Sequence, residues 1–166
     1  MAPETDGYLF EAQDFRHAMS QFATGVVVVA GSENGELVGF AAQSFVSLSL
    51  DPPLIAVCPQ KTSTSWPRIK ALGQFTINVL AASQSELSNA FAVPGEVPAV
   101  TWEPSELTGM PVIDDVIMHL DCALEAEHDA GDHTIAVAKV LSVNVPRPDA
   151  GPLLYCRATY GDFSPL

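Results

Sequence analysis

An uncharged stretch, residues 39–50, places the strongest constraint on how this chain can fold. Bulky Phe45 and Leu48 alternate with small or hydroxylated residues, and the stretch ends at Asp51-Pro52-Pro53, where prolines stop strand pairing. A surface strand would carry charges, and an apolar core strand would carry Val and Ile in place of serines and a glutamine. The pattern favours one wall of a site for a flat ligand with polar edges. A buried strand whose serines bond neighbouring carbonyls is an equally open alternative.

The length of 166 residues favours one domain over residues 1–166, with residues 1–11 as a flexible N-terminal arm. Hydrophobic residues make up 48%, enough for a core and also for a buried subunit interface. No apolar run approaches the roughly 20 residues of a membrane helix, and the acidic start is not that of a signal peptide. The three cysteines are an odd number set in apolar runs, which indicates reduced thiols and a cytoplasmic location.

The net charge of −13, with only seven Lys and Arg, argues against nucleic-acid binding, because a phosphate backbone requires a basic face. The same charge balance restricts how an anionic ligand can be held. A phosphate group must be bound by backbone N–H groups, by hydroxyls and by these few cations.

The first half of the chain alternates strand patterns with short helices. Gly25 ends an amphipathic helix, Asn34-Gly35 is a hairpin turn, and Gly73 ends a helix capped by Ser65. The expected elements are a helix over residues 12–23, strands over 26–29, 37–49, 54–58 and 75–80, and a helix over 66–72.

The second half is expected to contain mostly strands. A capping box over residues 83–86 opens a helix that ends near Phe91, and Trp102 anchors a long loop over 92–111. Strands follow over residues 117–127, 133–145 and 153–160, with a tight turn over 128–132. In the first of these strands, apolar and polar residues alternate, so His119 and Asp121 are expected on an exposed face.

Six or seven strands in largely antiparallel order, with few helices, predict a mainly β fold: a closed or nearly closed β-barrel with peripheral helices. A dinucleotide-binding α/β fold is excluded, because the chain has no G-x-G-x-x-G and no regular alternation of strands and helices.

Several segments together resemble the flavin reductase family with the FMN-binding split-barrel fold, from about Asp14 to Phe163. The matching segments, in chain order, are residues 15–19 and 22–26, the serine-rich 44–53 with its Asp-Pro-Pro, the hydroxyl loop 63–67, 75–80, the Gly-Asp-His of 131–133, and 152–155 with 160–161.

The resemblance implies a Greek-key-like, homodimeric split barrel and an NAD(P)H:flavin oxidoreductase. Reduced flavin would leave the protein and diffuse to a separate flavin-dependent oxygenase, as in two-component monooxygenases. Ala41 and Gln43 stand where many members have Thr and Asn, a form similar to the reductases of aromatic and steroid-ring hydroxylases. Losing the Thr hydroxyl leaves the choice between FMN and FAD open.

By the same resemblance, a set of residues on two strand ends, one loop and one helix end would contact the flavin. These residues are Leu37, Val38, Gly39, Phe40, Ala41, Gln43, Ser44, Cys58, Pro59, Gln60, Thr64, Ser65, Ala90 and Phe91. The flavin phosphate would lie at Thr64 and Ser65, beside the start of the helix, with Lys61 supplying charge. A capped helix with a solvated loop is the alternative there, and Phe91 can equally be core.

His133 is the candidate on the nicotinamide side, with Asp132 holding the turn or orienting the imidazole. Tyr155 and Arg157 are weaker candidates for binding NADH or NADPH. No protein acid or base is obligatory, because hydride transfer belongs to the two cofactors.

Rival interpretations remain. The two His and two Asp of residues 128–133 suggest a metal site, although Asp and Gly are common in any tight turn. Cys58 as a redox nucleophile lacks a partner thiol nearby in the sequence. The whole protein can also be a non-catalytic flavin-binding electron carrier on the same fold. An enzyme like pyridoxamine-phosphate oxidase is disfavoured by the cation-poor phosphate loop.

Overall fold

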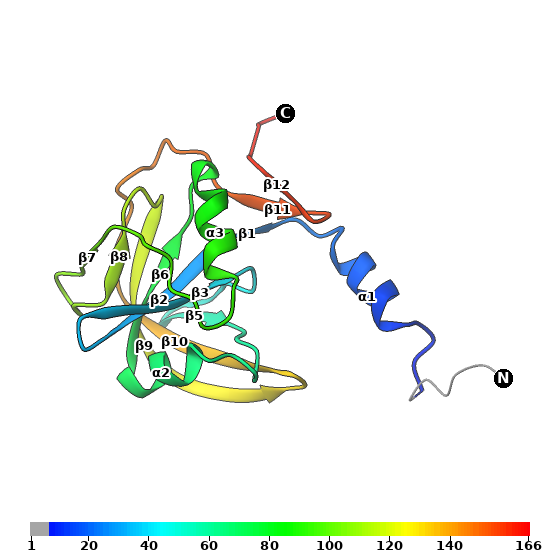
Figure 1. Ribbon diagram of the computed structural model, residues 1–166, viewed down its shortest axis with the longest axis horizontal. Helices are drawn as coiled ribbons and strands as arrows, with labels where there is room; N and C mark the ends of the chain where they lie inside the picture. The colour runs from blue at the N-terminus through cyan, green and yellow to red at the C-terminus, as the bar shows by residue number, and fades with distance from the viewer. Residues whose placement is uncertain (1–6) are drawn as a thin grey trace.

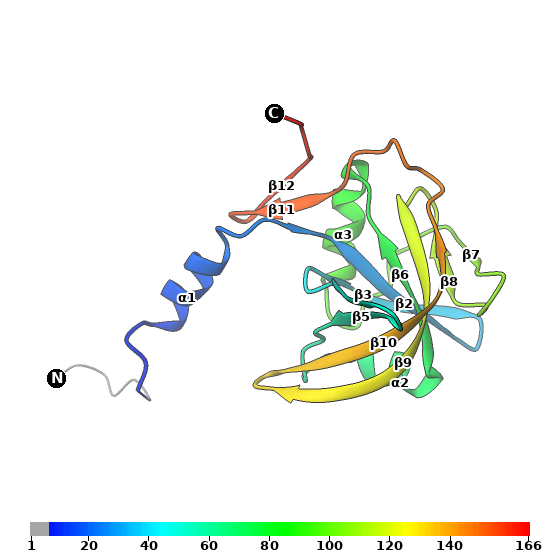
Figure 2. The same cartoon turned by 180° about the vertical axis from the view of Figure 1, so that it is seen from behind.

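The computed structural model describes residues 7–166 and is built around a seven-stranded antiparallel sheet (Figures 1 and 2). The strands, in order of pairing, are β3 (Glu36–Ala42), β2 (Val27–Glu33), β6 (Gln74–Val79), β9 (Met118–Ala130), β10 (His133–Asn144), β5 (Pro53–Val57) and β4 (Val46–Leu50). The predicted mainly β, antiparallel architecture is confirmed.

Smaller elements surround this sheet. They are the sheet β1 (Thr24–Gly25), β11 (Leu154–Cys156) and β12 (Thr159–Gly161), the pair β7 (Trp102–Pro104) and β8 (Pro111–Ile113), and the helices α1 (Ala12–Met19), α2 (Trp66–Leu72), η1 (Ala82–Gln84, a 3₁₀ turn) and α3 (Ser85–Phe91). None of the described helices is long and apolar enough to cross a membrane. The predicted arm over residues 1–11 lies partly outside the described residues, and its flexibility stays a prediction.

Strand β2 is buried on both faces, which explains why it begins as a run of valines. Val27 and Val29 pack in the core cluster that contains Trp66 of α2. Val28 belongs to a second cluster that contains Phe91 of α3. The two helices therefore cover opposite faces of the β2–β3 hairpin, and β2 has no solvent-facing side on which polar residues would be favoured.

The prediction of a single strand over residues 37–49 is wrong. The structure splits it into β3 and β4, which are the two opposite edges of the seven-stranded sheet. Residues 43–45 carry the chain directly from one edge to the other. Four residue steps span at most about 14 Å, so the sheet must curl until its edges approach. Because β3 and β4 do not pair with each other, the sheet is not closed into a barrel, which fits a split barrel.

Buried polar side chains hold the long loop against the sheet. The Asn78 Oδ1 accepts the backbone N–H of Ile113 at 2.9 Å, and the Asn78 amide donates to the Pro111 carbonyl at 3.2 Å. Asp121 accepts a short hydrogen bond from the Thr108 hydroxyl. The expectation that Asp121 is exposed is therefore wrong: it is 1% exposed, because this loop covers that face of β9. Trp102 packs against the second core cluster, as expected for an anchor.

Three element boundaries also differ from the prediction. The first helix ends at Met19 and not near residue 23. The strand expected over residues 153–160 is the β11–β12 hairpin, turned by Arg157 and Ala158, both with positive φ. The capping box lies earlier than expected, with the Gln84 side chain accepting the N–H of Ala81. Non-glycine residues in a left-handed turn give little sequence signal, which explains the missed hairpin.

Candidate active site

The outer edge of β3 offers a row of backbone hydrogen-bonding groups. The two-residue turn Asn34-Gly35, with φ of 55° and 83°, makes Glu33 and Glu36 a hydrogen-bonded pair. Such pairs recur at every second residue of an antiparallel hairpin. The N–H and C=O groups of the three intervening residues consequently point away from β2, toward the free edge. They belong to Leu37, Gly39 and Ala41, all predicted to contact the flavin.

Side chains of the same strand mostly face the core. Leu37 is 6% exposed, so it can meet a ligand only through its backbone. Val38 is fully buried, and its backbone groups face β2, so it lies behind the ligand-facing edge. A Cβ atom built on Gly39 would lie 2.9 Å from the Val29 carbonyl oxygen and 3.1 Å from the Phe91 ring. Glycine at this position therefore lets α3 pack closely behind the edge strand. Phe91 is a core residue, the alternative considered above, and it forms the wall behind β3.

Ser44 ties the end of β3 to the end of β5. Its Oγ accepts the backbone N–H of Cys58 at 2.9 Å. Beside it, the Gln43 Oε1 accepts the Thr24 hydroxyl at 3.1 Å. Both predicted flavin contacts thus hold the crossing between the sheet edges, and Ser44 ties the start of the 58–60 loop to the end of β3.

The loop after β5 lies in turn against the Gly-Asp-His turn. Pro59 accepts the Thr134 N–H at 3.0 Å, the Lys61 N–H donates to the Asp132 carbonyl at 2.9 Å, and Gln60 and His133 form a β-bridge. The flavin candidates on the loop and the nicotinamide candidate His133 are therefore neighbours, although more than 70 residues separate them in the sequence.

The imidazole of His133 is held by the residue before it. Its Nδ1 lies 2.8 Å from the Asp132 Oδ1. This contact lowers the pKa of Asp132 below the usual aspartate value, which keeps the carboxylate ionised. The arrangement agrees with the expected role of Asp132 in orienting the ring and leaves Nε2 as the free nitrogen for a ligand.

The predicted phosphate loop is organised differently from the expectation. The Oγ of Ser63, and not that of Ser65, accepts the N–H of Trp66 at the start of α2, at 3.1 Å. Ser65 occupies the N-cap position of α2, as predicted, but its side chain makes no capping hydrogen bond. Within residues 7–166, the hydroxyls of Thr64 and Ser65 make no side-chain hydrogen bond, so both remain available to an anion.

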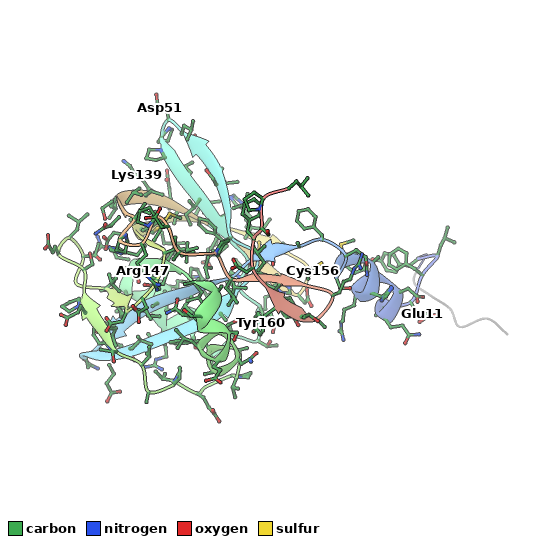
Figure 3. All side chains as sticks on the ribbon, turned by 90° about the horizontal axis from the view of Figure 1, so that it is seen from above. Glu11, Asp51, Lys139, Arg147, Cys156 and Tyr160 are labelled. Atoms are coloured by element: carbon green, nitrogen blue, oxygen red, sulfur yellow. The ribbon has the colours of Figure 1, made fainter. Side chains whose placement is uncertain are left out.

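The β11–β12 hairpin carries the weaker candidates. Tyr155 pairs with Thr24, whose hydroxyl reaches Gln43, so it is linked to the end of β3. Arg157 lies in the turn of the hairpin, where its N–H donates to the Ser20 carbonyl at 2.8 Å. Figures 1 and 2 show this hairpin well separated from the tip of β9 and β10, and Figure 3 places Cys156 beside the end of α1. Within one chain, Arg157 and His133 are not brought together.

The rival metal and cysteine interpretations gain no support. Asp129 pairs with Lys61 at 2.9 Å and Asp132 with His133, and no group of three or more metal-ligating side chains occurs within the described residues. All three cysteines are free, so the structure supplies no partner thiol for Cys58. Burial, together with the charge of Asp121, raises the pKa of Cys122 to about 12, so this thiol is unreactive.

Sequence reasoning missed one group beside this region. The Glu127 carboxylate accepts a hydrogen bond from the Trp66 indole N–H at 2.9 Å and forms a short ion pair with Lys70. These contacts join α2 to β9. Burial opposes ionisation of Glu127, but the contacts with Lys70 and Trp66 lower its pKa below the usual value. No local pattern marks these residues, because they meet only when the sheet brings β9 over α2.

Comparison with known proteins decides the family. Residues 19–164 match the family described as the flavin reductase like domain. This chain belongs to the flavin reductase family. HsaB, the reductase subunit of a flavin-dependent monooxygenase from Mycobacterium tuberculosis, is 39% identical over 93% of this chain and 84% of its own length. The FMN reductase (NADH) SmoA from Agrobacterium fabrum is 38% identical over 92% of this chain and 87% of its own.

Solved structures agree with the sequence comparison. Nitrilotriacetate monooxygenase component B from Mycobacterium thermoresistibile has a TM-score of 0.86 and 40% identity, covering 92% of this chain and 87% of that one. An NADH:FAD oxidoreductase from Streptomyces globisporus has a TM-score of 0.85 and 32% identity, covering 96% and 99%. The predictions of the family, of the split-barrel fold and of an NAD(P)H-dependent flavin reductase are thus confirmed.

Proposed function

We propose that this flavin reductase oxidises NADH, with NADPH as the alternative, and reduces FMN or FAD bound along the outer edge of β3. Reduced flavin then leaves for a separate oxygenase component. The convergence of predicted residues carries the proposal: Ser44 links the end of β3 to Cys58, and Gln60 is bridged to His133. A flat ring with donors and acceptors along one side fits the outward backbone groups of β3.

The residues of the chain would hold and orient the two cofactors. The backbone of Leu37, Gly39 and Ala41 would bind the polar edge of the flavin ring, and the free hydroxyls of Thr64 and Ser65 would bind its phosphate. When both cofactors are bound, hydride passes from the nicotinamide to the flavin. His133 would place the nicotinamide over the ring through its free nitrogen, and residues 58–60 would close the slot against water.

We also propose that the protein acts as a homodimer. Helix α1 has no buried residue and extends away from the body of the protein (Figures 1 and 2), although Phe15, Met19 and the nearby Phe22 are 52%, 54% and 78% exposed. An isolated helix of eight residues is not stable in water. Further exposed apolar side chains occur on β4 and at the end of β10. A second copy would cover these surfaces, and light scattering measures the resulting mass.

The names of several relatives support a separate oxygenase partner for this chain. Several relatives are named as reductase subunits or components of flavin-dependent monooxygenases, including a trigonelline monooxygenase component from Acinetobacter baylyi. We place the protein in the cytoplasm, a proposal supported by its three free cysteines.

The test of this function is oxidation of NADH by the purified protein, followed by nicotinamide absorbance, with and without added FMN or FAD. A rate that rises and saturates with free flavin is expected. A protein that is reduced once by NADH and then stops would be an electron carrier, and the proposal of catalysis would be lost.

A further inference from the structure

The indole ring of Trp66, at the start of α2, is held in one orientation. The residue is 5% exposed, and its ring meets two others edge to face: Phe75, with centroids 5.8 Å apart, and Phe40, at 6.3 Å. The indole N–H donates to the Glu127 carboxylate on β9 at 2.9 Å. The two ring contacts restrict the tilt of the indole, and the hydrogen bond fixes its rotation within its own plane.

Glu127 is itself fixed as the acceptor. Its other carboxylate oxygen forms the ion pair with Lys70, four residues further along α2, so both oxygens are engaged. A hydrogen bond to an ionised acceptor is roughly twice as strong as one between neutral groups. At the end of α2, the Gly73 carbonyl accepts the Leu124 N–H of β9 at 2.9 Å. Strand β9 therefore holds α2 at both ends.

The backbone of Trp66 closes the loop that carries the predicted phosphate partners. Its N–H donates to the Ser63 Oγ at 3.1 Å. Thr64 and Ser65 lie between these two residues, and their hydroxyls are the candidates for binding the flavin phosphate. The position of Trp66 therefore determines where the two hydroxyls lie.

We propose that Glu127 is a positioning residue for flavin binding: through the Trp66 indole, it fixes residues 63–65 where their hydroxyls meet the flavin phosphate. The proposal rests on the flavin site proposed above. Glu127 lies opposite Ala136 in the same β9–β10 hairpin that carries His133. This hairpin would thus serve both cofactors, because it presents His133 to the nicotinamide and holds the phosphate loop for the flavin.

The charge of Glu127 separates this role from a purely electrostatic one. A carboxylate near a phosphate site repels the phosphate, and Glu127 also neutralises Lys70. If charge alone mattered, Glu127→Ala would therefore bind FMN more tightly. Loss of positioning predicts the opposite, weaker binding of FMN. Glu127→Gln removes the charge but keeps an oxygen that accepts the indole N–H, so its affinity for FMN should equal or exceed that of the wild type.

Fluorescence titration of the full chain with FMN, and with riboflavin, which lacks the phosphate, tests the proposal without any turnover. We expect the Kd for FMN to rise about tenfold in Glu127→Ala and in Trp66→Phe, which lacks the indole N–H, because each loses a charge-assisted hydrogen bond. Riboflavin affinity should stay nearly intact, which also shows that both variants are folded. Glu125→Ala is the matched control, because Glu125 is an exposed carboxylate on the same strand.

Three results would overturn the positioning role. They are equal losses of FMN and riboflavin affinity, which would mean that Glu127 only supports the fold, unchanged FMN binding in both variants, and a Glu127→Gln variant as weak as Glu127→Ala. Equal Kd values for FMN and riboflavin in the wild type would remove the phosphate site at Thr64 and Ser65, and this proposal with it. An absence of NADH oxidation in a wild type whose FMN binding depends on Glu127 would instead remove the proposed catalysis and leave the positioning role standing.

Discussion

The hydrogen bond from the Cys58 N–H to Ser44 Oγ predicts that Ser44→Ala harms both the fold and flavin binding. The bond is 2.9 Å long and partly buried, and alanine leaves the Cys58 N–H without this acceptor. Leaving such a donor unsatisfied costs about 1–3 kcal/mol. A loss of about 2 kcal/mol would lower the Tm of a chain of this length by about 4–8 °C. Differential scanning calorimetry measures this shift directly.

Flavin affinity should fall in the same variant, because Ser44 ties the start of the 58–60 loop to the end of β3. If about 1.4 kcal/mol of the lost bond is carried into the position of this loop, the Kd for FMN rises about tenfold. Ser164→Ala is the matched control, since Ser164 is an exposed serine outside the helices and strands, and neither quantity should change. Weaker FMN binding at an unchanged Tm would mean that Ser44 contacts the flavin itself. A lower Tm with unchanged FMN binding would remove this loop from the site.

Three other substitutions test separate parts of the account. Gly39→Ala should lower the free energy of unfolding by about 1–3 kcal/mol in urea titrations, because the new Cβ lies 2.9 Å from the Val29 carbonyl oxygen; no change would mean that β3 can shift freely. Burial opposes ionisation of Asp121, but hydroxyl hydrogen bonds lower its pKa. Its stabilisation is therefore complete at neutral pH and lost as the pH falls through its folded pKa, below the unfolded value of about 3.9. Unfolding of Asp121→Asn should depend less on pH between about 2 and 5, and equal slopes would contradict this. His133→Ala should raise the KM for NADH with FMN affinity nearly intact, and unchanged NADH kinetics would remove His133 from the site.

Local sequence patterns located most strands but not how they are arranged. The Asn34-Gly35 turn and the stop at Gly73 follow from the backbone freedom of single residues, and the structure has both, with positive φ at each. The break between β3 and β4 was missed, because residues 43–45 contain no Gly or Pro. Only the order of the whole sheet shows that these residues cross between its two edges.

The residues of the candidate site were partly predictable from the sequence, but the contacts between them were not. Resemblance selected Ser44, Cys58, Gln60 and His133, and the structure joins them through hydrogen bonds and a bridge. The resemblance could not show that the Ser44 hydroxyl accepts a hydrogen bond from the backbone of Cys58. Nor could it reveal Lys70, which meets its partner on β9 only after the sheet has formed.

Buried polar groups limited sequence reasoning in another way. Asp121 alternates with apolar residues as an outward-facing residue would, yet it is buried beneath residues 105–113. Alternation reports which face of a strand a residue occupies, and it carries no information about what later covers that face. The sequence pattern therefore placed Asp121 on the correct face of β9, but it predicted the exposure of this residue wrongly.

A crystal structure of the protein soaked with FMN would show where the flavin binds. We expect the flavin ring along the outer edge of β3, with its polar side on the backbone of Leu37, Gly39 and Ala41 and its phosphate at Thr64 and Ser65. His133 should lie across the open face of the ring. Flavin bound away from this edge, with β3 free of ligand, would refute the proposed flavin site.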